Sequence, residues 1–159
     1  ILIGLVGSEM CIRDRGGTGG GMLGLFNTTV RPGIELVLDL AHGREACAWA
    51  DVIITGEGSI DSQTPYGKVP SGIAKLAQSQ GKPTIAIGGT VTRDPHTIEA
   101  LNETGIVATF GIAPGPADLA TLIANTERNV EITCAAIAGT LRVASATAVA
   151  ATTSPCESA

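Results

Sequence analysis

The hydrophobic positions in the middle of the chain alternate between short apolar runs and segments with helical spacing. Runs at 52–54, 84–89 and 106–110 predict three strands, and the second one closes on two glycines. Helical spacing between the strands predicts one helix from Pro70 to Gln80 and a shorter one around 96–101. This order is typical of βαβ units, whose right-handed crossovers bring the loops after the strands to one edge of a parallel sheet.

Helical patterns also flank this region on both sides. Residues 33–41 and 44–50 predict two short helices before the first strand. Residues 117–124 predict another, followed by a long alanine-rich helix over 125–145, and we expect its apolar residues to pack on the sheet. These residues are Val130, Ile132, Ala135, Ile137, Ala138 and Leu141. The fold expected for 16–145 is α/β, a Rossmann-like three-layer domain with a mostly parallel sheet, and 146–159 is expected to be a flexible tail.

Composition supports this fold class and excludes several functions. The chain is 44% hydrophobic, 3% aromatic and 16% charged, which suits an aliphatic core around a parallel sheet. A net charge of −5 without any basic cluster argues against binding to nucleic acid. No apolar run approaches the ~20 residues that span a membrane. The four cysteines lack metal-ligand spacing, so we expect reduced thiols and a cytoplasmic protein.

The first fifteen residues are expected to be foreign to the protein. Residues 4–14 (GLVGSEMCIRD) can be back-translated into a sequence that resembles the adapter and mosaic end of transposase-based sequencing libraries. We therefore treat 1–15 as an adapter-derived segment and give Cys11 no functional weight.

Functional side chains gather between Thr55 and Lys68, after the first predicted strand. Glu57, Asp61, Gln63 and Lys68 lie there among glycines, in the position where α/β proteins bind ligands. A Walker A loop is excluded because Ser62 stands where that motif needs glycine, and nucleophilic acyl transfer would have no base. Phosphoryl transfer would use this combination of acids, cation and amides. The residue types leave a purely structural loop, with helix-capping acids, equally open.

Two other functions stay open from the sequence. Gly19, Gly21 and Gly24 match the G-x-G-x-x-G spacing of an NAD-dependent oxidoreductase, but no predicted strand precedes them. Asp39 has the right separation for the ribose-binding acid, yet it lies in a predicted helix. A non-catalytic ligand-binding α/β domain is the third possibility.

The central segment ITGEGSIDSQTPYGKVPSGIAKLA, followed by GKPTIAIGG, resembles the signature of the bacterial glycerate kinase family of the glyoxylate/glucarate-pathway type. The likeness extends upstream through GGTGGGM and RPGIELVLDL and downstream to about Val143. Ser59 stands where arginine is usual, and Tyr66 where histidine is frequent. Family members are much longer, so the resemblance implies an incomplete, carboxyl-terminal portion that is inactive alone.

The resemblance implies that the ATP γ-phosphoryl group is transferred to a hydroxyl of D-glycerate with Mg²⁺, and it leaves the oligomeric state open. Asp61 is then the first candidate for the base or metal-linked acid and Glu57 the second, and both are candidate metal ligands. Lys68 would contact phosphate or the substrate carboxylate. The substrate-binding residues implied are Gly56, Gly58, Gln63 and Thr64.

Overall fold

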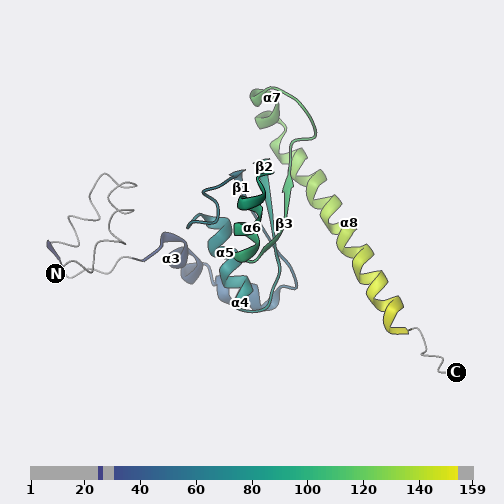
Figure 1. The fold of residues 1–159 in the computed structure, drawn as a ribbon, viewed down its shortest axis with the longest axis horizontal. Helices are drawn as coiled ribbons and strands as arrows, with labels where there is room; N and C mark the ends of the chain where they lie inside the picture. Colours follow the sequence, from purple (N-terminus) through teal and green to yellow (C-terminus); the bar gives the residue numbers. More distant parts are fainter. Residues whose placement is uncertain (1–24, 27–30, 154–159) are drawn as a thin grey trace.

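The structure, a computed structural model, describes residues 25–26 and 31–153. Its centre is a three-stranded parallel sheet in the order β1-β2-β3, formed by Ile53–Ile60, Thr84–Val91 and Ile106–Gly111 (Figure 1). The predicted α/β class with a parallel sheet is confirmed. The adapter-like segment 1–15 and the glycine-rich segment 16–24 lie outside the described residues.

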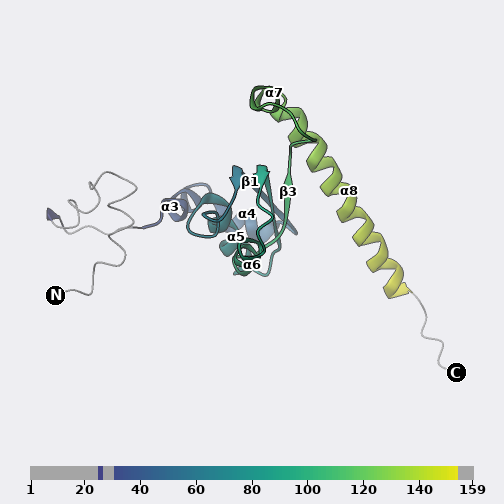
Figure 2. The ribbon, with the colours of Figure 1, turned by 45° about the horizontal axis from the view of Figure 1, so that its top comes forward.

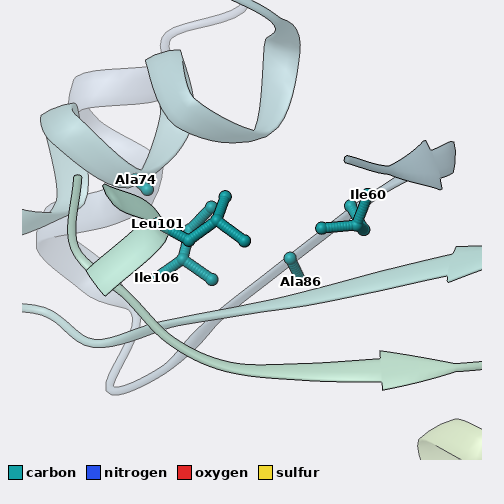
Figure 3. Close-up of a cluster of buried hydrophobic side chains, with 5 residues drawn as sticks. All are labelled: Ile60, Ala74, Ala86, Leu101 and Ile106. Carbon is teal, nitrogen blue, oxygen red and sulfur yellow. The ribbon is translucent and has the colours of Figure 1, made fainter. Parts of the chain in front are cut away.

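Two crossover helices connect the strands and form the core with them. Helix α5 (Val69–Gln78) packs on β1 and β2, and α6 (Pro95–Glu103) packs on β3. Alanines without any exposed surface, Ala74 on α5 and Ala86 on β2, allow the helix backbone to approach the sheet closely. The buried cluster shown in Figure 3 consists of Ile60, Ala74, Ala86, Leu101 and Ile106.

The first two strands are longer than the sequence pattern predicted. Instead of ending at Ile54, β1 continues to Ile60, and β2 continues beyond its two glycines to Val91. The two strands stay paired to their ends, with Ser59 opposite Thr90 and Ile60 opposite Val91. Backbone pairing thus extends the strands through residues of low strand propensity. Gly56, Glu57 and Gly58 consequently belong to a strand rather than to the loop in which they were expected.

The two helices before the sheet agree with the prediction. Helix α3 (Gly33–Leu40) and helix α4 (Gly43–Trp49) contact each other, and both contact α5. Arg31 precedes α3 and donates a 2.7 Å hydrogen bond to Asp39 near its end.

The carboxyl-terminal helices do not pack on the sheet as expected. A short helix α7 (Leu119–Ala124) leads into α8 (Thr126–Thr153), which runs past β3 and away from the sheet (Figures 1 and 2). Ile137 of α8 is buried, but Ile132 is 57% and Leu141 is 37% exposed. The prediction that the whole apolar set packs on the sheet is therefore wrong. Residues 146–153, expected in a tail, are helical. No helix in the described ranges is long and apolar enough to cross a membrane.

Helix α6 begins with an aspartate cap that makes its stability dependent on pH. Asp94 Oδ2 accepts hydrogen bonds from the Thr97 hydroxyl at 2.7 Å and the Thr97 backbone N–H at 2.8 Å. These bonds favour the ionised carboxylate and lower the pKa of Asp94. A lowered pKa stabilises the fold above the unfolded-state pKa of about 4, and this contribution is lost as the pH falls through the folded-state value.

We expect Asp94→Ala to lower the thermal unfolding midpoint at pH 7, because α6 loses its cap. The difference from the unaltered chain should shrink steadily as the pH is lowered past the folded-state pKa. Circular dichroism melts over an acid pH series measure this difference. Glu99→Gln, which removes a charge from the same helix, is the control and should show little change. A deficit that persists unchanged in acid would contradict the electrostatic origin of the cap.

Candidate active site at the carboxyl end of the first strand

A compact polar loop, residues 61–68, connects the end of β1 to the start of α5. Two backbone hydrogen bonds fold it into consecutive turns, from Thr64 N–H to Asp61 and from Tyr66 N–H to Gln63. Gly67 then takes a φ of +95°, a left-handed conformation that glycine adopts without steric cost. Pro70 in the first turn of α5 fixes where the helix starts. The loop therefore returns Lys68 to the end of β1.

Thr64 joins the strand to this loop. Its side chain is fully buried, and its hydroxyl donates a 2.5 Å hydrogen bond to Glu57 Oε1. The hydroxyl oxygen of Thr64 also accepts a 3.0 Å hydrogen bond from the Asp61 backbone N–H. One hydroxyl thus holds a carboxylate of β1 and the first residue of the loop in fixed positions. Thr64, predicted as a substrate-binding residue, is thus placed to orient Glu57 and the start of the loop.

Lys68 brings the two predicted acids into one cluster. Its ammonium nitrogen lies 3.2 Å from Asp61 Oδ1 and 3.9 Å from Glu57 Oε1. Glu57 is the less accessible of the two acids, with a side chain 18% exposed against 41% for Asp61. The Asp61–Lys68 pair therefore borders solvent, where a ligand can reach it, while Glu57 lies behind it.

The ionisation of Asp61 follows from its hydrogen bonds. The backbone N–H of Gln63 donates to Asp61 Oδ1 at 2.9 Å and, with the Lys68 ammonium, lowers the pKa of this carboxyl group. Asp61 is therefore anionic at neutral pH. A strongly acidic group is a weak proton acceptor but a good partner for a hydroxyl or a cation.

The other predicted site residues lie around this cluster without all joining it. Gln63 is exposed and contributes its backbone N–H to Asp61. Ser59, found where arginine is usual, accepts a 3.0 Å hydrogen bond from the Thr90 hydroxyl on the neighbouring strand.

The two glycines of β1 have different surroundings. A β-carbon on Gly56 would lie 2.8 Å from the Ile87 carbonyl oxygen, so the close pairing of β1 with β2 requires glycine there. A β-carbon on Gly58 would meet no atom within 4 Å. The absence of a side chain at Gly56 thus has a structural cause, whereas the surroundings of Gly58 do not require glycine.

A cavity that sequence reasoning missed lies next to this strand end. Its volume is about 470 Å³, and we call it the α7–α8 cavity. Residues 56–58 and 87–90 line it from the sheet, 112–113 from the segment after β3, and one side of α7 and α8 closes it. Asn129 lines the cavity although only 7% of it is exposed. Its position in a long helix gave no sequence signal, because that helix was expected to pack on the sheet.

Possible metal ligands do not form a larger cluster within the described ranges. No group of three or more histidine, cysteine, aspartate or glutamate residues gathers there. Cys47 and Cys134 are free thiols, Cys47 being buried in α4.

Comparison with known proteins finds similar sequences over most of the chain. The sequence model of the glycerate kinase family matches residues 15–142, most of the chain. The chain belongs to the glycerate kinase family. Similar curated members include a glycerate kinase from Bacillus cereus, 41% identical over 82% of this chain and 33% of the relative. A glycerate kinase from Bacillus subtilis is 37% identical over 81% of this chain and 33% of its own length.

Structural comparison gives the same family. A solved structure described as a candidate glycerate kinase 2 from Salmonella typhimurium LT2 matches with a TM-score of 0.60 and 36% identity. The match covers 82% of this chain and 32% of that protein. The chain thus spans about a third of the length of the family members it matches. The alternative of an NAD-dependent oxidoreductase does not agree with membership in a kinase family.

The contrast between the two glycines can be measured. We expect Gly56→Ala to lower the free energy of unfolding by about 1–3 kcal/mol, because the new methyl group overlaps the Ile87 carbonyl. Gly58→Ala, in the same strand, should change it by less than about 0.5 kcal/mol. Urea unfolding of the 159-residue chain compares the two variants. Equal losses would contradict the difference in their surroundings.

The bridging role of Thr64 predicts a second difference. Thr64→Val keeps the side-chain shape but leaves Glu57 and the Asp61 N–H without their hydroxyl partner, at a cost of about 1–3 kcal/mol. Thr64→Ser keeps the hydroxyl and should retain most of the stability. Urea unfolding separates the two variants. The interpretation is wrong if valine is tolerated as well as serine.

Proposed function

We propose that this chain forms one side of the active site of a kinase that transfers the ATP γ-phosphoryl group to a hydroxyl of D-glycerate. The observation that supports this most directly is the cluster of Lys68, Asp61 and Glu57 at the carboxyl end of β1. Phosphoryl transfer is catalysed mainly by positioning and by charge stabilisation, which needs fixed cations and acids rather than a covalent nucleophile. Family membership supplies the substrate class.

Lys68 is the residue proposed to contact an anion, either phosphate oxygens or the glycerate carboxylate. Its ammonium is held by two acids on one side, and the side chain is 33% exposed. An ammonium oriented by fixed partners can bind an incoming anion with little reorganisation. Gln63, whose backbone N–H bonds to Asp61, and Gly58, next to Glu57 in β1, are proposed to orient the substrate.

Asp61 is proposed to accept a hydrogen bond from the reacting hydroxyl. As that oxygen bonds to the γ-phosphorus and the bond to ADP breaks, the hydroxyl proton passes to Asp61 and then to water. The lowered pKa of Asp61 keeps it ionised beforehand. The weak basicity that results is tolerable, because a loose transition state demands little deprotonation before transfer. Thr64 and Glu57 are then positioning residues, because they fix the start of the loop.

The donor set is compatible with Mg²⁺ bound in the manner usual for phosphoryl transfer. Mg²⁺ is commonly held by one or two carboxylates together with phosphate oxygens and water. Asp61 and Glu57 are the residues that would hold the ion, and both also interact with the Lys68 ammonium. When bound, the ion would neutralise charge on the phosphate oxygens.

The 159 residues alone are proposed to lack turnover. Family members place this region in proteins about three times as long, and a kinase cleft needs groups on both sides of its substrates. A cytoplasmic location is part of the same proposal.

The role of Asp61 can be tested in a chimera in which residues 15–142 replace the matching third of the Bacillus cereus glycerate kinase. We expect Asp61→Asn to lower kcat by about 10²- to 10⁴-fold in a coupled assay of ADP release, because the amide cannot take the proton. Asp51→Asn, just before β1, is the control and should leave kcat unchanged.

Two results would count against these assignments. A kcat within a few-fold of the unaltered chimera would remove Asp61 from the mechanism. A folded chimera that releases no ADP with glycerate would contradict the proposed reaction itself.

A further inference from the structure

The α7–α8 cavity has a chemistry unlike that of the Lys68 cluster beside it. Its walls include Ile87 from β2 and Leu122, Ile123 and Val130 from α7 and α8. Its volume of about 470 Å³ lies within the range of about 300–1,000 Å³ usual for small-molecule sites. A small anion such as glycerate has no apolar surface to bury there. The cavity therefore suits a flat, largely apolar group.

Asn129 adds an amide to these mainly apolar walls, which also contain Thr90 and Thr126. The residue is more than nine-tenths buried, and its backbone N–H donates to the carbonyl of Asn125, which lies just before α8. Within the described part of the chain, its side-chain amide has no hydrogen-bond partner. Among the described residues, the fully buried side-chain atoms without a partner are Gln80 Oε1 and Thr84 Oγ1, so the Asn129 amide keeps accessible surface at the cavity and is placed to bond a ligand there. An amide offers a donor and an acceptor side by side, the pattern that pairs with the edge of adenine.

The position of the cavity connects it to the charged cluster. Residues 56–58 line it, so Glu57 borders the cavity as well as lying 3.9 Å from the Lys68 ammonium. Gly58, the next residue, also lines the cavity and has open space where a side chain would begin. A molecule with an apolar base at one end and phosphates at the other could place its base in the cavity and its phosphates near Lys68.

We propose that the α7–α8 cavity binds the adenine base of the nucleotide, with the Asn129 amide hydrogen-bonded to the base edge. This inference rests on the proposed kinase function, because that function supplies the nucleotide. Asn129 is then a specificity-determining residue for the phosphoryl donor, and the polyphosphate extends past Gly58 toward Lys68.

Adenosine is the probe for a direct test, because it carries the base without phosphates. Saturation-transfer NMR and calorimetry on the 159-residue chain should detect adenosine binding, and uridine should bind more weakly. We expect Asn129→Ala to raise the Kd for adenosine about tenfold. Ala113→Trp, which fills the cavity from an exposed position, should abolish binding. Asn102→Ala, at an exposed asparagine on α6, is the matched control, and circular dichroism verifies that each variant is folded.

Adenosine binding that survives both Asn129→Ala and Ala113→Trp would overturn the proposal, as would no adenosine binding to the folded chain. The chimeric kinase separates this failure from failure of the reaction. Asn129→Ala should raise the KM for ATP about tenfold and leave the KM for glycerate unchanged. An active chimera with an unaltered KM for ATP would refute the base site and leave the kinase function standing. A folded but inactive chimera with Asn129-dependent adenosine binding would refute the reaction and leave the base site standing.

Discussion

The close pairing of β1 with β2 determines where every group of the candidate site lies. A β-carbon on Gly89 would lie 2.7 Å from the Gly58 carbonyl oxygen, and one on Gly56 would overlap Ile87. Only strands without side chains at these points can stay paired to their carboxyl ends. Because they stay paired, Glu57 is held in a strand, and the loop that begins at Asp61 starts from a rigid support. Sites on rigid elements hold their geometry better than sites on free loops.

The charges of the site are arranged so that each holds another in place. The positive charge of Lys68 offsets the repulsion between the two carboxylates, each within 4 Å of its ammonium nitrogen. Thr64 fixes one of these acids and the backbone of the other. The cluster is therefore prepared before any ligand arrives, which is the condition under which charged groups stabilise a transition state most effectively.

The sequence predicted the helices and the parallel sheet because local periodicity determines both. It misplaced the end of β1 because glycine, glutamate and serine have low strand propensity, and pairing with β2 outweighs propensity. It also misplaced the apolar face of α8, since periodicity shows that a helix has an apolar side but not what covers it. Glu57, Asp61 and Lys68 were recognisable as residue types from the sequence. The hydrogen bonds that Thr64 makes to Glu57 and Asp61 could not be predicted, because a threonine that bridges two residues and one that binds substrate look the same in sequence.

The position of Asn129 beside the charged cluster could be seen only in the three-dimensional structure. In the sequence it is one polar residue in an alanine-rich helix, about seventy positions from the charged loop. The turn between α7 and α8 places it at a cavity shared with residues 56–58, so the apolar compartment and the charged cluster meet at one strand end. A phosphoryl donor has this same division, with an uncharged base and a charged chain of phosphates. The sheet edge thus offers adjoining surfaces for both parts of one molecule, which a site for glycerate alone would not require.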